Sequence, residues 1–127
     1  MALDHISVAV SDIGKSGAFY DAVLGHLGMA RIADREMTIG YGKKFPEFWI
    51  NARPDMAPVS ADTGVHIALR ARSEELVLEC YQAALENGGT DAGSPGARQA
   101  ALTTYFGAFF KDPDGNKVEI VTFPKPE

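Results

Sequence analysis

The chain has 127 residues, of which 46% are hydrophobic and 23% charged, and its formal net charge is −5 at pH 7. This length suits one globular domain and is short for two. The acidic balance argues against binding nucleic acid through phosphate contacts, and no apolar run approaches the ~20 residues of a membrane span. The single cysteine, Cys80, excludes an internal disulfide, and the first twenty residues lack a secretory apolar core, so we expect a cytoplasmic protein.

The first part of the chain predicts a strand, a helix and three short strands. Alternating apolar residues in LDHISVAV, residues 3–10, indicate a half-buried strand. In the next segment Ser11 or Asp12 can cap a helix, whose apolar face continues at helical spacing until Gly28. Strand candidates follow near residues 29–34, 37–42 and 47–51.

The same order of elements begins again 61 residues later, in GVHIALRARSEELVLECYQAALENGG. Ser73 is the expected helix cap, and strand candidates follow near residues 97–101, 104–110 and 117–123. At this offset six pairs are identical: His5/His66, Ile6/Ile67, Tyr20/Tyr81, Ala22/Ala83, Leu24/Leu85 and Gly28/Gly89. Such self-similarity predicts an α+β fold of two βαβββ modules, over 1–51 and 65–127. Residues 52–64 are the predicted linker, and residues 88–96 a second, flexible loop.

Three residues share the strand faces that the helices are not expected to cover. His5 and His66 hold equivalent places in the two modules, and Glu119 lies between apolar neighbours in the last strand. If the two modules close into one curved sheet, two imidazoles and a carboxylate converge there, which is a donor set suited to a divalent metal. Solvated or hydrogen-bonded polar residues are the alternative interpretation of each position.

Three motifs resemble the vicinal oxygen chelate superfamily, which includes glyoxalases, bleomycin-binding proteins, fosfomycin-resistance thiol transferases and extradiol dioxygenases. They are DHISVAV with SGAFYDAVLGHLGM, then GVHIAL, then FKDPDGNKVEIV. The resemblance implies paired βαβββ modules that form a curved mixed sheet around a metal-binding cavity, with the helices on the outer face. It also implies that His5, His66 and Glu119 are ligands of a divalent ion, which could be Zn, Ni, Co, Mn or Fe.

The chain departs from the glyoxalase pattern at one position. Glyoxalases and epimerases of this superfamily use a Glu or Gln on the last strand of module one as a fourth ligand. Aligning FWI (48–50) with VEI (118–120) puts Trp49 there, and an indole cannot take that role. Glu47 lies on the same strand face and could substitute only if the strand shifts, so a solvent-exposed Glu47 is favoured. Trp49 is expected to form an apolar wall of the cavity or to lie in the core.

Four further residues are candidates for the pocket. Arg70 shares the strand face of His66 and could hold an anionic substrate, but a solvated charge at the strand end is the favoured interpretation. Arg98 lies beside the 88–96 loop and could contact the substrate. Tyr105 could donate a proton or a hydrogen bond near the metal. Tyr105 and Phe109 share one face of their strand, while Phe106 and Phe110 share the other, and the sequence leaves open which pair packs against a helix.

The sequence therefore predicts a metal-dependent, glyoxalase-like enzyme that acts on a small substrate with two neighbouring oxygens. The reaction stays open among lyase or isomerase chemistry, thiol transfer and dioxygenation. The alternative is a non-enzymatic module that sequesters a small apolar or aromatic compound, as the bleomycin-binding relatives do. Because each module supplies only half of a cup, we also expect a homodimer in which sites are shared between chains. Pairing of the two modules within one chain, across the 52–64 linker, is the alternative.

Overall fold

The computed structural model describes residues 2–124. Residue 1 and residues 125–127 of the predicted 1–127 domain lie outside the described residues. The elements follow one another as β1 (Ile6–Val10), α1 (Ile13–Gly25), β2 (Ala30–Asp34), β3 (Thr38–Gly42), β4 (Pro46–Ala52), β5 (Ile67–Arg70), α2 (Glu74–Glu86), β6 (Thr90–Gln99), β7 (Thr104–Lys111) and β8 (Lys117–Thr122). The βαβββ order thus occurs twice, and we call β1–β4 with α1 module one and β5–β8 with α2 module two.

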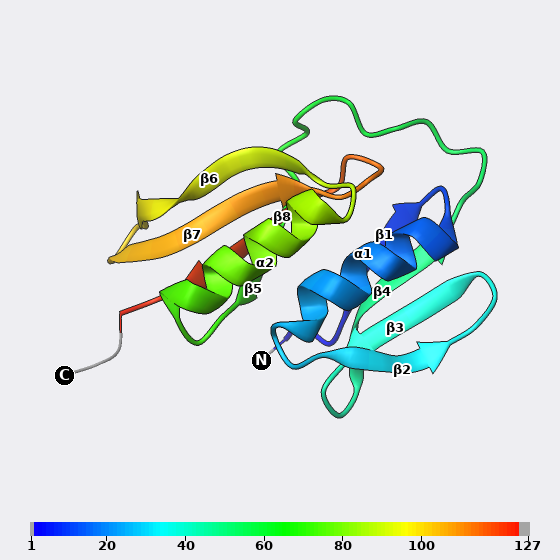
Figure 1. Cartoon of the computed structure of the whole chain (residues 1–127), viewed down its shortest axis with the longest axis horizontal. Coiled ribbons are helices and arrows are strands. Elements are labelled where there is room, and N and C mark those ends of the chain that lie inside the picture. The colour runs from blue at the N-terminus through cyan, green and yellow to red at the C-terminus, as the bar shows by residue number, and fades with distance from the viewer. Residues whose placement is uncertain (1, 125–127) are drawn as a thin grey trace.

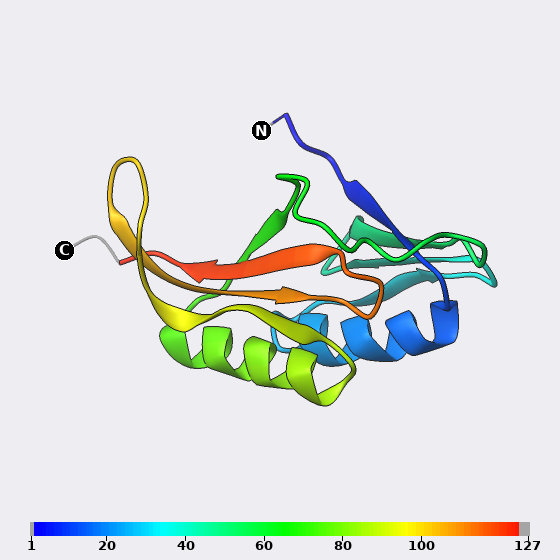
Figure 2. The same ribbon diagram turned by 90° about the horizontal axis from the view of Figure 1, so that it is seen from above.

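Each module forms its own four-stranded mixed sheet. The strand orders are β1-β4-β3-β2 and β5-β8-β7-β6, with a parallel pair at one edge of each sheet. Within the described part of one chain the two sheets are not hydrogen-bonded to each other and do not close into a barrel. Helices α1 and α2 pack side by side (Figure 1), and both lie on the same side of the two sheets (Figure 2). The sheet face turned away from the helices is called the open face below. None of the described helices is long and apolar enough to cross a membrane.

Both helices begin where the sequence predicted. The side chain of Asp12 accepts a hydrogen bond from the Lys15 amide, and that of Ser73 accepts one from the Leu76 amide. Such caps satisfy backbone N–H groups that have no partner within the helix. The apolar faces of the helices meet in one core across the two modules. Its largest fully buried side chains are Val10, Phe19, Tyr20, Val23, Leu24, Tyr41, Phe48, Ile50, Val77, Phe110, Val118 and Ile120.

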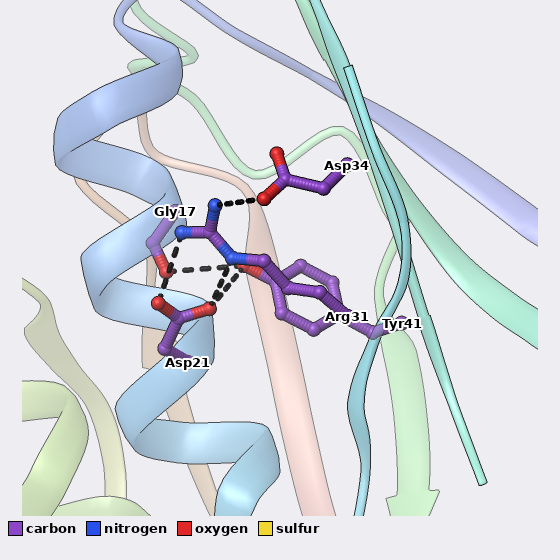
Figure 3. Close-up of polar contacts among 5 residues, drawn as sticks. All are labelled: Gly17, Asp21, Arg31, Asp34 and Tyr41. Carbon is purple, nitrogen blue, oxygen red and sulfur yellow. Dashed lines mark hydrogen bonds and ion pairs between the residues drawn. The ribbon is translucent and has the colours of Figure 1, made fainter.

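A polar network connects α1 to strands β2 and β3 of module one (Figure 3). Arg31 on β2 donates two hydrogen bonds, of 2.8 and 2.9 Å, to the Asp21 carboxylate on α1, and a longer one to Asp34. The hydroxyl of Tyr41 on β3 donates to the same carboxylate at 2.9 Å. A Cβ on Gly17 would lie 2.7 Å from the Arg31 guanidinium, so this glycine allows the close approach of helix and strand. Burial raises the pKa of Tyr41, which therefore stays a hydrogen-bond donor at neutral pH.

The Asp-Pro-Asp-Gly turn between β7 and β8 joins module two to module one. The buried Asp112 carboxylate accepts hydrogen bonds from the Tyr20 hydroxyl and from the backbone and side chain of Asn116. Asp114 accepts one from the Ser11 amide at 2.9 Å, across the module boundary. Gly115 has a φ of 95°, as the sequence predicts for this turn. The turn therefore connects β7 to β8 and also holds module two against module one.

The prediction of a flexible loop over residues 88–96 was wrong. Most of this segment belongs to β6, which pairs with β7 in antiparallel register. The register shifts between Asp91 and Gly93 and again between Gly93 and Gly96. Bulges of this kind let an edge strand accommodate glycines and a proline, here Pro95, that would disrupt a central strand. Composition alone therefore suggested a loop where the chain forms an irregular edge strand.

Candidate active site

Glu119 is a buried carboxylate on the open face of module two. Its neighbours Val118 and Ile120 are fully buried in the core on the helix side of β8, so the alternation of the strand turns Glu119 to the opposite side. Glu119 is nevertheless only 4% exposed. A carboxylate at this depth requires polar partners, because its transfer out of water is costly.

Two polar side chains from neighbouring strands meet the two oxygens of this carboxylate. The Nε2 atom of His66 lies 3.3 Å from Oε1 of Glu119, and the Tyr105 hydroxyl donates a 2.8 Å hydrogen bond to Oε2. His66 keeps 40% of its side-chain surface exposed, so the pair opens to solvent on the imidazole side. Two of the residues that the sequence singled out therefore contact Glu119 directly.

Strand register explains how these side chains meet. On one side of β8, β5 pairs Ala68 with Glu119, and His66 directly precedes β5, two residues before Ala68. On the other side, β7 pairs Phe109 with Glu119, and the Tyr105 ring crosses Gly107 to reach the carboxylate. A Cβ on Gly107 would lie 3.0 Å from the Tyr105 ring and 3.4 Å from Oε2 of Glu119. Gly107 therefore leaves the space that the tyrosine ring occupies.

The pKa of Tyr105 is raised, first by burial and then by its hydrogen bond to Glu119. The phenol therefore stays protonated at neutral pH and acts as a donor. It fixes the position of the carboxylate and carries a proton close to any molecule bound beside Glu119.

Aromatic rings and cations surround the pair on the open face. The Phe109 ring lies edge-on to the His66 imidazole, with 5.3 Å between ring centroids. Arg98 lies over the Phe109 ring at 5.2 Å and Lys117 at 4.8 Å, while Arg70 lies 4.9 Å over the ring of Phe123. These distances allow cation–π contacts. The predicted residues Arg70, Arg98 and Phe109 thus lie on the same face as Glu119.

The structure answers the question of which aromatic pair packs against the helix. Phe110 is fully buried in the core and Phe106 packs against it, while Tyr105 and Phe109 turn to the open face. Two site neighbours were missed by the sequence analysis, namely Lys117 and Phe123. Strand alternation could have identified both, because they lie two residues before and four residues after Glu119 on the same strand face.

His5 lies apart from the His66–Glu119 pair. It directly precedes β1, is exposed, and its Nδ1 atom is 2.6 Å from a carboxylate oxygen of Asp4. Across residues 2–124, no three His, Cys, Asp or Glu side chains of a single chain are grouped as a metal site would require. One chain thus brings together two of the three predicted ligands.

Trp49 occupies the place in module one that Glu119 occupies in module two. In module one Ile6 pairs with Phe48 and Ser7 with Trp49, just as Ile67 pairs with Val118 and Ala68 with Glu119. The half-buried indole lies over Gly40 of β3, where a Cβ would be 2.9 Å from three ring carbons. Glu47 is exposed. An apolar ring therefore stands where the second module has its carboxylate.

The fold and these strand positions define a protein of paired βαβββ modules with a His–Glu pair on an open sheet face. Residues 2–120 match the model of the Glyoxalase/Bleomycin resistance protein/Dioxygenase superfamily, and the chain belongs to this family.

Similar proteins span almost the whole chain. The lactoylglutathione lyase of Salmonella typhimurium is 29% identical over 95% of this chain and 92% of its own length. A probable lactoylglutathione lyase of Synechocystis is 32% identical over 95% of both chains. Among solved structures, a glyoxalase/bleomycin resistance protein from Albidiferax ferrireducens is 30% identical, with a TM-score of 0.85 over 97% of this chain and all of that one.

Proposed function

We propose that this protein is a metal-dependent enzyme of the glyoxalase kind, acting on a small substrate with two neighbouring oxygens. The observation that carries the proposal is the buried Glu119 carboxylate, whose oxygens meet an imidazole on one side and a phenol on the other. His66 is the basic group beside this carboxylate. A divalent cation fits the chemistry of this donor set, since imidazole nitrogen and carboxylate oxygen both bind such ions.

The proposed ligands are His66 and Glu119 of one chain and His5 of a second copy. Within its own chain His5 is exposed, lies outside the buried core and is not grouped with His66 and Glu119. The packing of α1 on α2 and the hydrogen bonds of Asp112 and Asp114 hold the two modules of one chain together through their helix sides. If a partner chain in a homodimer supplies His5 as the third ligand, the contacts between the two modules of each chain stay as they are.

Three protein ligands would leave coordination positions for the two substrate oxygens. When bound, the ion would act as a Lewis acid that stabilises negative charge developing on these oxygens. Glu119 would keep the orientation set by the Tyr105 hydrogen bond, and the protonated phenol could donate to a substrate oxygen. The aromatic rings of Phe109 and Trp49 would exclude water, while Arg70 and Arg98 would attract an anionic portion of the substrate.

The names of the two lyase relatives favour lyase or isomerase chemistry over thiol transfer and dioxygenation. Trp49 weakens the argument for the same reaction as these relatives, because an apolar ring stands where glyoxalases have a fourth metal ligand. The same observation supports a second candidate function, which is the sequestration of an aromatic or apolar compound against Trp49. We further propose a cytoplasmic location, which suits the single buried cysteine.

An assay of lactoylglutathione lyase activity, run with added divalent ions and again after chelation, tests the first function. We expect activity that requires the ion and is lost in Glu119→Gln, whose side chain keeps its size but loses its charge. Glu36→Gln, at an exposed carboxylate outside the open face, is the matched control. If the wild type is inactive and takes up no metal, yet binds apolar aromatic compounds, the sequestration function holds instead.

A further inference from the structure

A pocket with a volume of about 450 Å³ lies where the two modules meet, between the end of α1 and the start of α2. Module one lines it with the end of α1, residues 25–28, and with Lys43 from the turn after β3. Module two contributes residues 70–72 and Leu76, from the end of β5 and the first turn of α2. His66, Tyr105 and Glu119 do not line this pocket, and Arg70 is the one residue that it shares with the open face, where its guanidinium lies over the Phe123 ring.

The pocket is strongly basic although the chain as a whole is acidic. Nine residues line it and none is acidic, while four are basic: His26, Lys43, Arg70 and Arg72. His26 has a carboxylate neighbour, Glu79, at 3.5 Å. Among residues 2–124 the other three cations have no ion-pair partner, and Glu74, beside the same strand–helix junction, is not within ion-pair distance of Arg72. Like charges gathered in one concavity repel one another, and a bound anion would relieve that repulsion.

We propose that this pocket binds a small multivalent anion, with a phosphate or phosphate ester as the chemical class. Guanidinium groups offer paired donors that match phosphate oxygens, and an ammonium group adds a point charge. Arg72 provides the guanidinium and Lys43 the ammonium group, while the Arg70 guanidinium lies over the Phe123 ring. The apolar side chains of Leu27 and Leu76 line the same cavity and suit the organic part of an ester.

Binding at this place has a consequence for the fold, because both modules supply cations to the pocket. An anion held by Lys43 of module one and Arg72 of module two bridges the junction. Since the pocket exists only when the modules are packed together, the anion binds the folded chain in preference to the unfolded chain. It therefore raises the temperature of unfolding in proportion to the logarithm of its concentration above the dissociation constant.

Calorimetric titration of the full chain with inorganic phosphate, at constant ionic strength, tests the proposal. We expect one saturable site per chain and an affinity about tenfold lower in each of Lys43→Ala and Arg72→Ala. The matched controls Lys44→Ala and Arg35→Ala remove the same charge at exposed positions outside the pocket, and they retain the wild-type affinity. Absence of saturable binding, or equal losses in variants and controls, overturns the proposal.

Two further measurements make the result independent of variant folding and of the proposed enzyme function. Phosphate added to the wild type shifts the backbone amide signals of residues 25–28 and of Ala71, and leaves those of the Glu119 strand unchanged. Glu119→Gln keeps its phosphate affinity, because that carboxylate is not part of the pocket. If amide shifts concentrate on β8, or if Glu119→Gln loses phosphate binding, the phosphate occupies the active-site face and the second site does not exist.

Discussion

The hydroxyl of Tyr20 on α1 donates a 2.7 Å hydrogen bond to the carboxylate of Asp112, 92 residues further along the chain. Both side chains are buried, and the bond crosses from module one to module two. Burial raises the pKa of both groups, with the nearby carboxylate of Asp112 adding to the effect on the tyrosine. This contact makes the Asp-Pro-Asp-Gly turn a buried polar link between the two modules.

Loss of this hydrogen bond should destabilise the whole chain. In Tyr20→Phe the ring still fills its place, but Asp112 loses one of its donors in a buried setting. We expect the free energy of unfolding to fall by about 1–3 kcal/mol, the cost of a buried polar group with an unmade hydrogen bond. Urea unfolding followed by circular dichroism measures the change. Tyr81→Phe is the control, because its hydroxyl bonds to the exposed Asp91, and a loss as large as that of Tyr20→Phe would contradict the argument.

The sequence predicts the turn that contains Asp112, but it does not predict that Tyr20 contacts this turn. The turn itself was predictable, because Pro113 and Gly115 suit its backbone angles and the next strand alternates clearly. Its partner Tyr20 was assigned only to the apolar face of a helix. Which helix a turn approaches depends on how two modules pack, and local periodicity contains no information about that packing.

The sequence likewise predicted only some of the contacts in the candidate active site. Strand alternation correctly put Glu119 and His66 on faces away from the helices, and the structure shows that they meet. Alternation alone could not decide whether Tyr105 or Phe106 faces the site, because both sides of β7 carry aromatic residues. Sequence symmetry suggested that His5 joins this pair, but within one chain His5 contacts Asp4 and lies apart from His66 and Glu119.

The thiol of Cys80 should be unreactive in the folded protein. It is fully buried in the core, and burial raises its pKa to about 12. At pH 8 the folded protein therefore holds almost no thiolate, which is the nucleophilic form. Alkylation by iodoacetamide at this pH should be at least about tenfold faster in denaturant than in buffer. Equal rates in the two conditions would contradict the buried position.

Metal binding should require His66. We expect about one divalent ion per chain in the wild type and none held tightly in His66→Ala, because removal of one of three ligands weakens a site that leaves positions open. Metal content after desalting, measured by mass spectrometry, gives the stoichiometry. His26→Ala removes a half-exposed imidazole outside the open face and should keep the metal. Unchanged stoichiometry in His66→Ala would exclude this ligand set.

Glu47 should not replace the fourth ligand that Trp49 lacks. The two residues share a strand face, but Glu47 is exposed near the start of β4 while the indole lies over Gly40. Glu47→Gln should therefore bind metal as tightly as the wild type. A metal-bound crystal structure provides the direct check. A Glu47 oxygen at about 2.0–2.2 Å from the ion would refute the expectation and would favour a four-ligand lyase site.

The metal site should be shared between two chains. Within one chain His66 and Glu119 meet, whereas His5 is exposed and apart from them, and the buried Tyr20–Asp112 contact fixes the modules on their helix sides. A twofold dimer in which module one of one chain faces module two of its partner would contain two identical sites. Metal affinity would then depend on association, because a monomer could not supply all three ligands.

Mixing His5→Ala with His66→Ala separates shared sites from sites within one chain. Each variant alone carries a defect in both sites of its dimer. After subunit exchange, a mixed dimer places both substitutions in one site and leaves the other intact, so half of the sites in mixed dimers should bind metal again. With random exchange of equal amounts, half of the dimers are mixed, and about a quarter of the wild-type metal content should return. Native mass spectrometry of differently tagged chains confirms the exchange. If exchange is complete and no metal returns, both histidines serve the same chain and the shared site is excluded.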